Sequence, residues 1–315
     1  MKAIQATSFG GPDVLSLVLP DTPLPGPGTV LIQVAAAGAG TVDVLIRKGL
    51  YPGGINPGFI PGMEVAGTVI ATGDQVAEDW IGKRVYAMTM LGGYATHIVV
   101  PQEALVPLPG NLSFEVAVGL GINALVAQYS LQRAALAPGD ALLVRGAGGG
   151  IGSMLVQLAL AGGYRVTATG TTPAKRAALE RIGVGSFFSV TTPEAAGQAF
   201  KAIIDPVAGP DLDRYVAQLA DNGTYVLNGA AAGFPPDNFG LSWLSRFQRS
   251  LTLACFSLDA IPPQEARASL QQLFRQAEQG QLQAFIGATF ALEDAAEAHR
   301  VLESGSVFGK IVLQV

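Results

Sequence analysis

The chain has very few of the side chains that build disulfides and zinc sites. Its 315 residues include one cysteine, Cys255, and two histidines, His97 and His299. One thiol rules out a disulfide within the chain, and a zinc site is hard to build from this supply of ligands. We therefore expect no metal. Cys255 lies in an apolar stretch and is expected to be an inert core thiol, and both histidines are expected to be structural.

Charge is also scarce, at 14% of the residues, and the net charge is −5. A nucleic-acid groove needs a basic surface, so no nucleic-acid partner is expected. Glycine, proline or charge interrupts every apolar run before it reaches the roughly 18 residues of a membrane span. The first residues, MKAIQATSFGGPDVL, do not have the apolar core of a signal peptide. These absences lead us to expect a cytoplasmic protein with no membrane partner.

Hydrophobic residues and glycine are abundant, at 49% of the chain and 40 residues respectively. This length predicts about two domains. Residues 1–110 hold short β-like runs broken by glycine and proline, which indicates a strand-rich domain. From Ser113 onward, strand-like and helix-like runs alternate, which is typical of a doubly wound parallel sheet in an α/β fold. The main predicted helices are 117–137, 151–162, 174–182, 212–219, 265–279 and 293–303, and the strands after residue 140 are 141–145, 165–169, 202–205, 224–228, 251–256 and 310–315.

The run Leu142–Gly152, with the sequence LLVRGAGGGIG, is the most informative motif of the chain. Its glycines follow a predicted strand and open a predicted helix. Glycine lets the backbone approach a phosphate closely, and the free N–H groups of a helix N-terminus bind a pyrophosphate. We interpret the motif as a dinucleotide site, with a merely structural turn as the alternative. The residues expected to bind the cofactor here are Gly146, Gly149, Gly150, Ile151 and Gly152.

The end of the next predicted strand, 165–169, indicates which dinucleotide binds. A site for NAD usually has an acidic residue here to hold the ribose 2′-hydroxyl. This chain has only hydroxyls and two cations, which suit a 2′-phosphate. We therefore predict NADPH (NADP+) as the cofactor, with solvated charges at a helix start as the alternative. The residues concerned are Thr169, Gly170, Thr171, Lys175 and Arg176.

Six segments along nearly the whole length point together to one family. They are Val42–Pro52 (VDVLIRKGLYP), Pro61–Gly67 (PGMEVAG), Gly82–Val85 (GKRV), Gly92–Pro101 (GGYATHIVVP), the glycine run, and Ser304–Leu313 (SGSVFGKIVL). With them the chain resembles the zinc-independent quinone oxidoreductases (zeta-crystallin-like) of the medium-chain dehydrogenase/reductase superfamily.

The resemblance implies a GroES-like, strand-rich catalytic domain, residues 1–121 and 262–315, and a Rossmann dinucleotide-binding domain, residues 122–261. It also implies a homodimer that pairs through the edge of the Rossmann sheet. Leu251–Leu258 is the candidate edge strand, because it is an apolar run.

Zinc-dependent relatives have Gly-His-Glu where this chain has Gly62–Glu64 (GME), and a ligand cysteine near positions 38–43, where it has GAGTVD. A thioether beside a carboxylate is not a zinc site, so the resemblance implies an enzyme without a metal. Glu64 is then expected to be a buried carboxylate paired with an arginine of the same domain. Arg47 is expected to pair with Asp43 on the same helix, with a place in the substrate pocket as the alternative.

Without a metal, hydrogen bonds alone must polarise the substrate, which suits quinones and α,β-unsaturated carbonyl compounds. The implied reaction transfers a hydride from NADPH, with a proton from a hydroxyl or water. The predicted catalytic residues are Tyr51, as proton donor, and Asn123, near the nicotinamide; packing under a loop is the alternative for Tyr51. The other residues that the resemblance places near the cofactor are Asn228, Gly229, Ala230, Phe256 and Ser257.

Two departures from the family pattern leave the function open. Gly40 stands where relatives usually have asparagine, and Leu45 where they often have tyrosine. Both departures remove polar contacts near the nicotinamide and substrate. The first hypothesis is an NADPH-dependent reductase of quinones or enones. The alternatives are an enoyl-thioester reductase and a non-catalytic NADPH-binding sensor or structural protein.

Overall fold

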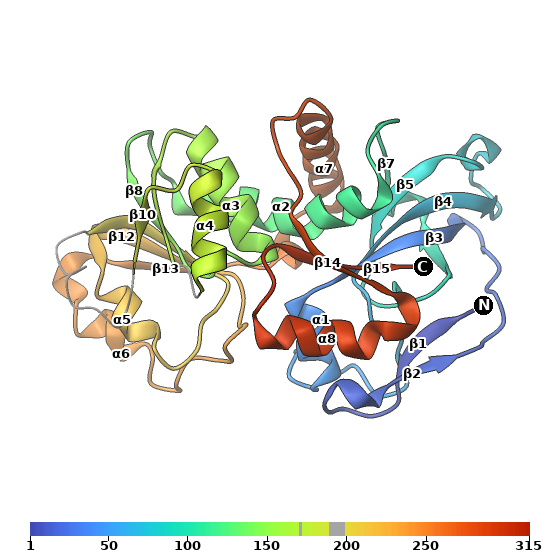
Figure 1. Cartoon of the computed structure of the whole chain (residues 1–315), viewed down its shortest axis with the longest axis horizontal. Coiled ribbons are helices and arrows are strands. Elements are labelled where there is room, and N and C mark those ends of the chain that lie inside the picture. Colours follow the sequence, from blue (N-terminus) through green and yellow to red (C-terminus); the bar gives the residue numbers. More distant parts are fainter. Residues whose placement is uncertain (170–171, 189–198) are drawn as a thin grey trace. The chain divides into compact units, whose positions relative to one another are not determined.

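The computed structural model describes residues 1–169, 172–188 and 199–315. The predicted cofactor residues Gly170 and Thr171 lie outside the described residues. The chain divides into two compact units (Figure 1). Unit 1 combines Met1–Ile122 with Pro262–Val315, and unit 2 is Asn123–Ile261.

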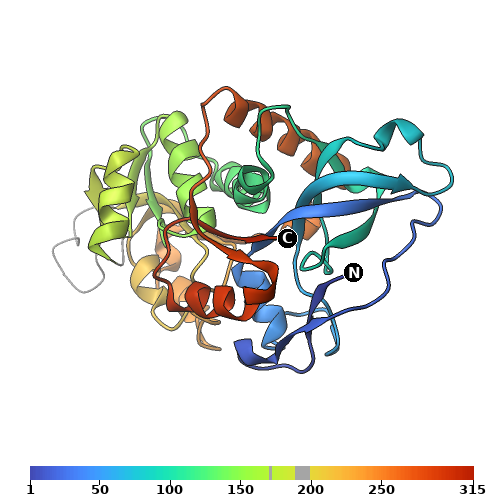
Figure 2. The ribbon, with the colours of Figure 1, turned by 45° about the vertical axis from the view of Figure 1, so that its right-hand side comes forward.

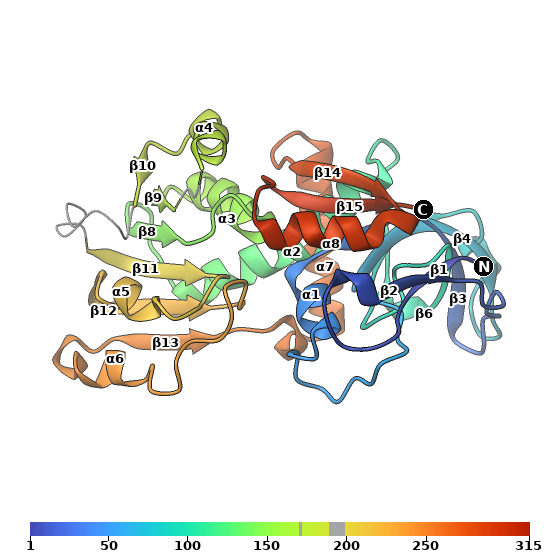
Figure 3. The same cartoon turned by 60° about the horizontal axis from the view of Figure 1, so that its bottom comes forward.

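Unit 2 is built on a six-stranded parallel sheet with the order β10-β9-β8-β11-β12-β13. Figure 3 shows β8, β11, β12 and β13 side by side. The chain runs outward from β8 through β9 to β10 and then returns to the other side of β8, so the strand order reverses between β8 and β11. Ligands of open α/β sheets bind at such a switch point, outside the carboxyl ends of the strands. The bounds are β8 Ala141–Val144, β9 Arg165–Ala168, β10 Ser186–Phe187, β11 Phe200–Asp205, β12 Leu219–Leu227 and β13 Thr252–Cys255.

The core of unit 2 follows from the apolar runs of its central strands. All four residues of β8 are buried, as expected of a parallel strand covered on both faces. Phe200 of β11 lies in a hydrophobic cluster with Leu212 and Val216 of one helix. The helices of this unit are α3 Gly150–Ala161, α4 Pro173–Arg181, α5 Leu212–Val216, α6 Leu241–Leu244 and the second part of α2 Phe114–Ala134.

Unit 1 is strand-rich, as predicted. Its seven-stranded sheet has the order β14-β15-β3-β4-β5-β7, with β6 also paired to β3, and β1 and β2 form a separate pair (Figure 2). Pairing is antiparallel except between β14 and β15. The strands are β1 Ala3–Ala6, β2 Leu15–Val18, β3 Thr29–Ala39, β4 Glu64–Thr72, β5 Arg84–Met88, β6 His97–Pro101, β7 Leu105–Pro107, β14 Ile286–Ala291 and β15 Lys310–Gln314; the helices are α1 Thr41–Arg47, α7 Pro263–Glu278, α8 Ala295–Ser304 and the start of α2.

Helix α2 begins three residues before the predicted start and is not continuous. Gly121 has φ 6° and ψ −114°, which breaks the helix there. Among the described residues, α2 is the one helix long and apolar enough to cross a membrane, and 67% of that window is buried inside the protein. An apolar helix of this length is therefore a core element of the fold here.

The prediction for Cys255 is wrong, because its side chain is exposed. Cys255 ends β13, which lies at the edge of the sheet and, among the described residues, pairs with β12 alone. A strand with a neighbour on one side only can stay exposed to solvent even when its sequence is apolar. The edge position of 251–258, in contrast, agrees with the expectation.

Candidate cofactor site

The glycine turn lies between β8 and α3, at the switch point of the sheet in unit 2. Gly146 has φ 62°, a conformation that favours glycine. A Cβ on Gly152 would lie 2.2 Å from the carbonyl oxygen of Gly146, so no larger residue fits there. Gly149 is the N-cap of α3 and makes no side-chain capping bond. The first N–H groups of α3, from Gly150 onward, have no acceptor within the helix, so they are suited to bind a phosphate.

Two predicted residues lie against this turn. The hydroxyl of Thr169 accepts a hydrogen bond from the Gly146 N–H at 2.9 Å. The side chain of Lys175 passes beside Gly148, where a Cβ would lie 2.8 Å from Lys175 Cδ. Burial of Lys175 lowers the pKa of its ammonium group. An anion bound at the turn would offset the cost of burying this charge.

Arg176 and Asn123 have different surroundings. The Arg176 guanidinium lies over the ring of Phe187 in β10, at 4.4 Å from the ring centroid. Asn123 is buried, and its amide lies against the first residue of α3, because a Cβ on Gly150 would be 2.8 Å from Asn123 Nδ2. The structure therefore brings Asn123 to the glycine turn and places the guanidinium of Arg176, on α4, against Phe187 of β10.

The residues after β12 form the next part of this edge. Asn228 donates through Nδ2 to the hydroxyl of Ser130 at 2.7 Å, and its Oδ1 is buried with no partner among the described residues. Whichever way the amide is oriented, one of its polar atoms is left unpaired. A buried unpaired polar atom is costly, so a ligand group is expected to pair with it. A Cβ on the next residue, Gly229, would lie 2.5 Å from the carbonyl oxygen of Pro206, and Ala230 is buried.

Phe256 and Ser257 follow β13 and make local contacts. The ring of Phe256 is buried and lies 6.2 Å from that of Tyr129, with the Arg133 guanidinium 5.6 Å from its centroid. Ser257 caps a short 3₁₀ helix by accepting a hydrogen bond from the Asp259 N–H. Their proposed backbone contact with a nicotinamide stays a prediction.

Tyr51 lies in unit 1, in the loop between α1 and β4. Its half-buried ring packs against the hydrophobic core cluster of that unit. This contact is the one expected from the packing interpretation that the sequence left open, and the role of Tyr51 as proton donor stays a prediction.

A buried network of charged residues next to the glycine turn was not expected from the sequence. Arg145, buried directly before Gly146, donates to Asp205 Oδ2 at 3.1 Å and to Asp211 Oδ1 at 2.5 Å. The hydroxyl of Tyr225 donates to Asp205 as well, and burial together with that carboxylate raises its pKa. The network ties the ends of β8, β11 and β12 together. The signal available in the sequence was an arginine and an aspartate that each end an apolar strand.

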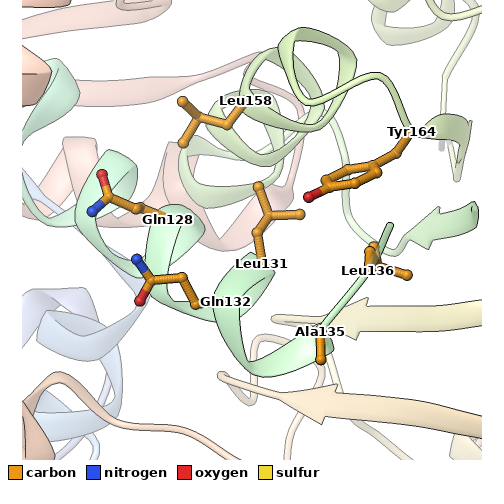
Figure 4. Close-up of a pocket in the computed structure, with 7 residues that line it drawn as sticks. All are labelled: Gln128, Leu131, Gln132, Ala135, Leu136, Leu158 and Tyr164. Atoms are coloured by element: carbon orange, nitrogen blue, oxygen red, sulfur yellow. The ribbon is translucent and has the colours of Figure 1, made fainter. Parts of the chain in front are cut away.

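A groove in unit 2 does not belong to this site. It has a volume of about 320 Å³. Figure 4 shows the side chains that line it, which come from α2 and the residues after it, from α3, and from Tyr164. Leu158 lies near the end of α3, and Tyr164 directly precedes β9, so the groove lies at the amino end of the strands. The glycine turn lies at their carboxyl end. The lining residues are Gln128, Leu131, Gln132, Ala135, Leu136, Leu158 and Tyr164.

Two ion-pair predictions for unit 1 are wrong. Glu64 pairs with Lys310, whose Nζ lies 2.5 Å from Glu64 Oε1, and not with an arginine. Arg47 contacts Glu303 and not Asp43. Asp43 instead accepts hydrogen bonds from the N–H groups of Gly40, at 2.9 Å, and Gly62, at 3.0 Å. As the third residue of α1, it reaches back to the helix N-cap, and that position keeps it from Arg47.

Comparison with known proteins identifies the family. Residues 26–110 match the alcohol dehydrogenase GroES-like domain, and residues 182–313 match the zinc-binding dehydrogenase family. A quinone oxidoreductase of Pseudomonas aeruginosa is 31% identical over 325 residues, which cover 99% of each chain. The crystal structure of Escherichia coli quinone oxidoreductase complexed with NADPH aligns with a TM-score of 0.92 at 26% identity and covers 100% of both chains.

One relative is much longer. A phenolphthiocerol/phthiocerol polyketide synthase of Mycobacterium tuberculosis is 32% identical over 298 residues. These cover 91% of this chain and 13% of that protein. The chain therefore spans a small part of this relative and nearly the full length of the quinone oxidoreductase.

These similarities define an oxidoreductase with a GroES-like and a Rossmann fold. The chain belongs to the quinone oxidoreductase family of the medium-chain dehydrogenase/reductase superfamily. The predicted family and fold class are confirmed.

The name of one matched family implies zinc, but the residues of unit 1 do not fit it. Both Glu64 oxygens have donors of this chain: Lys310 on Oε1, and the Tyr86 hydroxyl and Ile122 N–H on Oε2. Asp43 is occupied by backbone N–H groups, as described above. In the part of the chain that the structure describes, no three His, Cys, Asp or Glu residues are grouped to hold a metal.

Proposed function

We propose that the protein is an NADPH-dependent reductase of quinones or α,β-unsaturated carbonyl compounds that transfers a hydride without a metal ion. The position of Lys175 is the observation that carries this proposal. Its side chain crosses the glycine turn at Gly148, beside the N-terminus of α3. An ammonium group and the free N–H groups of a helix N-terminus both bind phosphate groups.

The residues present fit the cofactor. The N–H groups from Gly150 onward would hold the pyrophosphate, and Lys175 would bind a phosphate, with Arg176 farther along α4. The unpaired Oδ1 of Asn228 would accept a hydrogen bond from a ribose hydroxyl or the carboxamide. The NADPH complex of the Escherichia coli relative supports this assignment.

The bound cofactor would supply the hydride, and the protein would supply position and hydrogen bonds. We propose that Asn123, fixed against Gly150, donates or accepts a hydrogen bond near the nicotinamide. Tyr51 is the proposed proton donor, and burial of its ring against the core would hold its hydroxyl in one direction. Quinones and enones need only such weak polarisation to accept a hydride, which is why they are the proposed substrates.

The function is tested by mixing purified protein with NADPH and following absorbance at 340 nm against quinones, enones and enoyl thioesters. Turnover of quinones or enones is expected. The polyketide synthase relative favours enoyl thioesters as the alternative, and turnover of these alone would establish it. NADPH binding without turnover of any compound would contradict both and leave a sensor or structural protein.

Cofactor choice is tested by the substitution Lys175→Met. It removes the ammonium and keeps most of the side-chain volume, so KM for NADPH should rise roughly 10-fold to 100-fold while KM for NADH changes little. The matched control is Lys201→Met, since Lys201 lies on β11 and donates to the Asn222 carbonyl. A preference of the wild type for NADH would contradict the proposed role of Lys175.

A further inference from the structure

A buried ion pair crosses strand β3 in unit 1. Lys310 is the first residue of β15 and Glu64 the first residue of β4, and these strands flank β3. Their side chains are 6% and 1% exposed, with 2.5 Å between Nζ and Oε1. The two residues are 246 positions apart in sequence. Two distant strand starts therefore meet over one segment of β3.

Two glycines make room for this pair. The registers pair Ala37 with Val65 and Ala39 with Ile311. Extended by one position, they place Glu64 opposite Gly38 and Lys310 opposite Gly40, and positions two apart face the same side of a strand. A Cβ on Gly38 would lie 2.5 Å from Glu64 Oε1, and one on Gly40 would lie 3.5 Å from Lys310 Nζ. The ion pair therefore lies in a trough that a larger residue at position 38 would close.

The second carboxylate oxygen of Glu64 accepts hydrogen bonds at the break in helix α2. Oε2 accepts hydrogen bonds from the Tyr86 hydroxyl at 2.7 Å and from the Ile122 N–H at 3.0 Å. Ile122 follows Gly121, where the helix is broken, so its N–H needs a partner from outside the helix. A Cβ on Gly121 would lie 2.3 Å from this oxygen. The carboxylate thus replaces the helical acceptor that the break removes.

A carboxylate this deeply buried is stable only with a cation beside it. The cation beside Glu64 is the Lys310 ammonium. We propose that Lys310 is a positioning residue that, by neutralising Glu64, holds the backbone at the break in α2. This goes beyond the proposed function, because it depends only on contacts within unit 1.

The proposal is tested by chemical rescue of Lys310→Ala, which removes the cation and leaves a cavity. Its melting temperature should fall on the order of 10 °C, because the charge of Glu64 is left buried without a cation beside it. Ethylammonium should restore part of the loss, whereas neutral ethanol should not, and neither should affect the wild type. The control Lys83→Ala removes a half-exposed partner of Asp79 and should leave the melting temperature nearly unchanged.

A second variant decides the question if Lys310→Ala does not fold. Lys310→Met combined with Glu64→Gln removes both charges, so it should melt at a higher temperature than Lys310→Met alone. A double variant that is no more stable than the single one would overturn the proposal. So would ethanol rescue equal to ethylammonium rescue, or one zinc per wild-type chain that is lost in Glu64→Gln. The NADPH assay does not enter this test, so the proposed function can fail separately.

Discussion

His299 is a buried side chain that connects three distant segments of unit 1. Its Nδ1 lies 3.0 Å from Arg47 Nη1, and its Nε2 lies 3.0 Å from the Tyr94 hydroxyl. Burial, together with the Arg47 charge, lowers the pKa of His299 to about 3. The ring therefore stays neutral at physiological pH, as a structural histidine does. Asp43 in the same unit behaves in the opposite sense, since burial raises its pKa to about 6.

These two groups predict compensating effects of pH on stability. Between pH 6.5 and about 3 the unfolded chain holds a proton on His299 that the folded chain lacks, so stability falls as the pH is lowered. Between pH 6 and 3.8 the folded chain holds the extra proton on Asp43, so stability rises as the pH is lowered. The two slopes have similar size and nearly cancel between pH 6 and 4.

The substitution His299→Gln removes one side of this balance. Urea unfolding at several pH values should show that its free energy of unfolding, relative to wild type, rises by about 1.4 kcal/mol for each pH unit from 6 to 4. Asp43→Asn is the control and should give the reverse trend. A difference between wild type and His299→Gln that does not depend on pH would contradict the assigned pKa.

At the scale of elements, β8, the glycine turn and α3 act as one unit. The apolar run that ends at Val144 forms a buried strand, and the glycines let the backbone fold back on itself before α3 begins. This segment was predictable because its order is local: an apolar strand, glycines and an apolar helix follow each other without a gap. The exact bounds of α3 differ from the prediction by one residue at each end.

Gly152→Ala tests how strictly this element needs its glycines. The added Cβ would meet the Gly146 carbonyl oxygen at 2.2 Å. The Cβ is bonded directly to the backbone and the carbonyl is part of it, so neither can move without distorting the turn. We expect the melting temperature to fall by roughly 3–10 °C and NADPH affinity, measured by fluorescence titration, to fall at least about 10-fold. Gly185→Ala is the control, because a Cβ there meets nothing within 4 Å. Equal behaviour of the two variants would contradict the close contact.

Other elements were not predictable from local patterns. The apolar run from residue 117 indicates one helix, but the break at Gly121 depends on the carboxylate of Glu64, which comes from another strand. Strand β14 was not predicted. Its residues alternate only between exposed and half-buried, and its partner β15 begins 19 residues after β14 ends, so no local pattern marks it as a strand. In both cases the deciding contact is distant in sequence.

At the scale of the whole molecule, the surface of unit 2 bears on the predicted homodimer. In the part of the chain that the structure describes, one edge of β13 has no partner strand. Leu241, Leu244 and Phe247, in the segment before it, are 57%, 67% and 73% exposed. Exposed apolar side chains near an unpaired strand edge are typical of an interface. The homodimer itself stays a prediction.

Phe247→Glu tests this prediction. A charge at an apolar interface should weaken the dimer, so light scattering after size exclusion should show the wild type as a dimer and the variant shifted toward monomer. Ile81→Glu is the control, since Ile81 is a half-exposed apolar residue of unit 1, whereas β13 belongs to unit 2. A wild type that is monomeric at all concentrations would contradict the predicted homodimer.

The sequence by itself determined the α/β class, the family and the glycine turn with its helix. These depend on periodicity, glycine spacing and residue types that are read within a few neighbouring positions. Only the tertiary structure decided that Glu64 pairs with Lys310, that Arg47 contacts Glu303 and His299, and that Cys255 is exposed. The physical reason is that a buried charge takes whichever opposite charge the fold brings to it, and burial depends on which strands become neighbours.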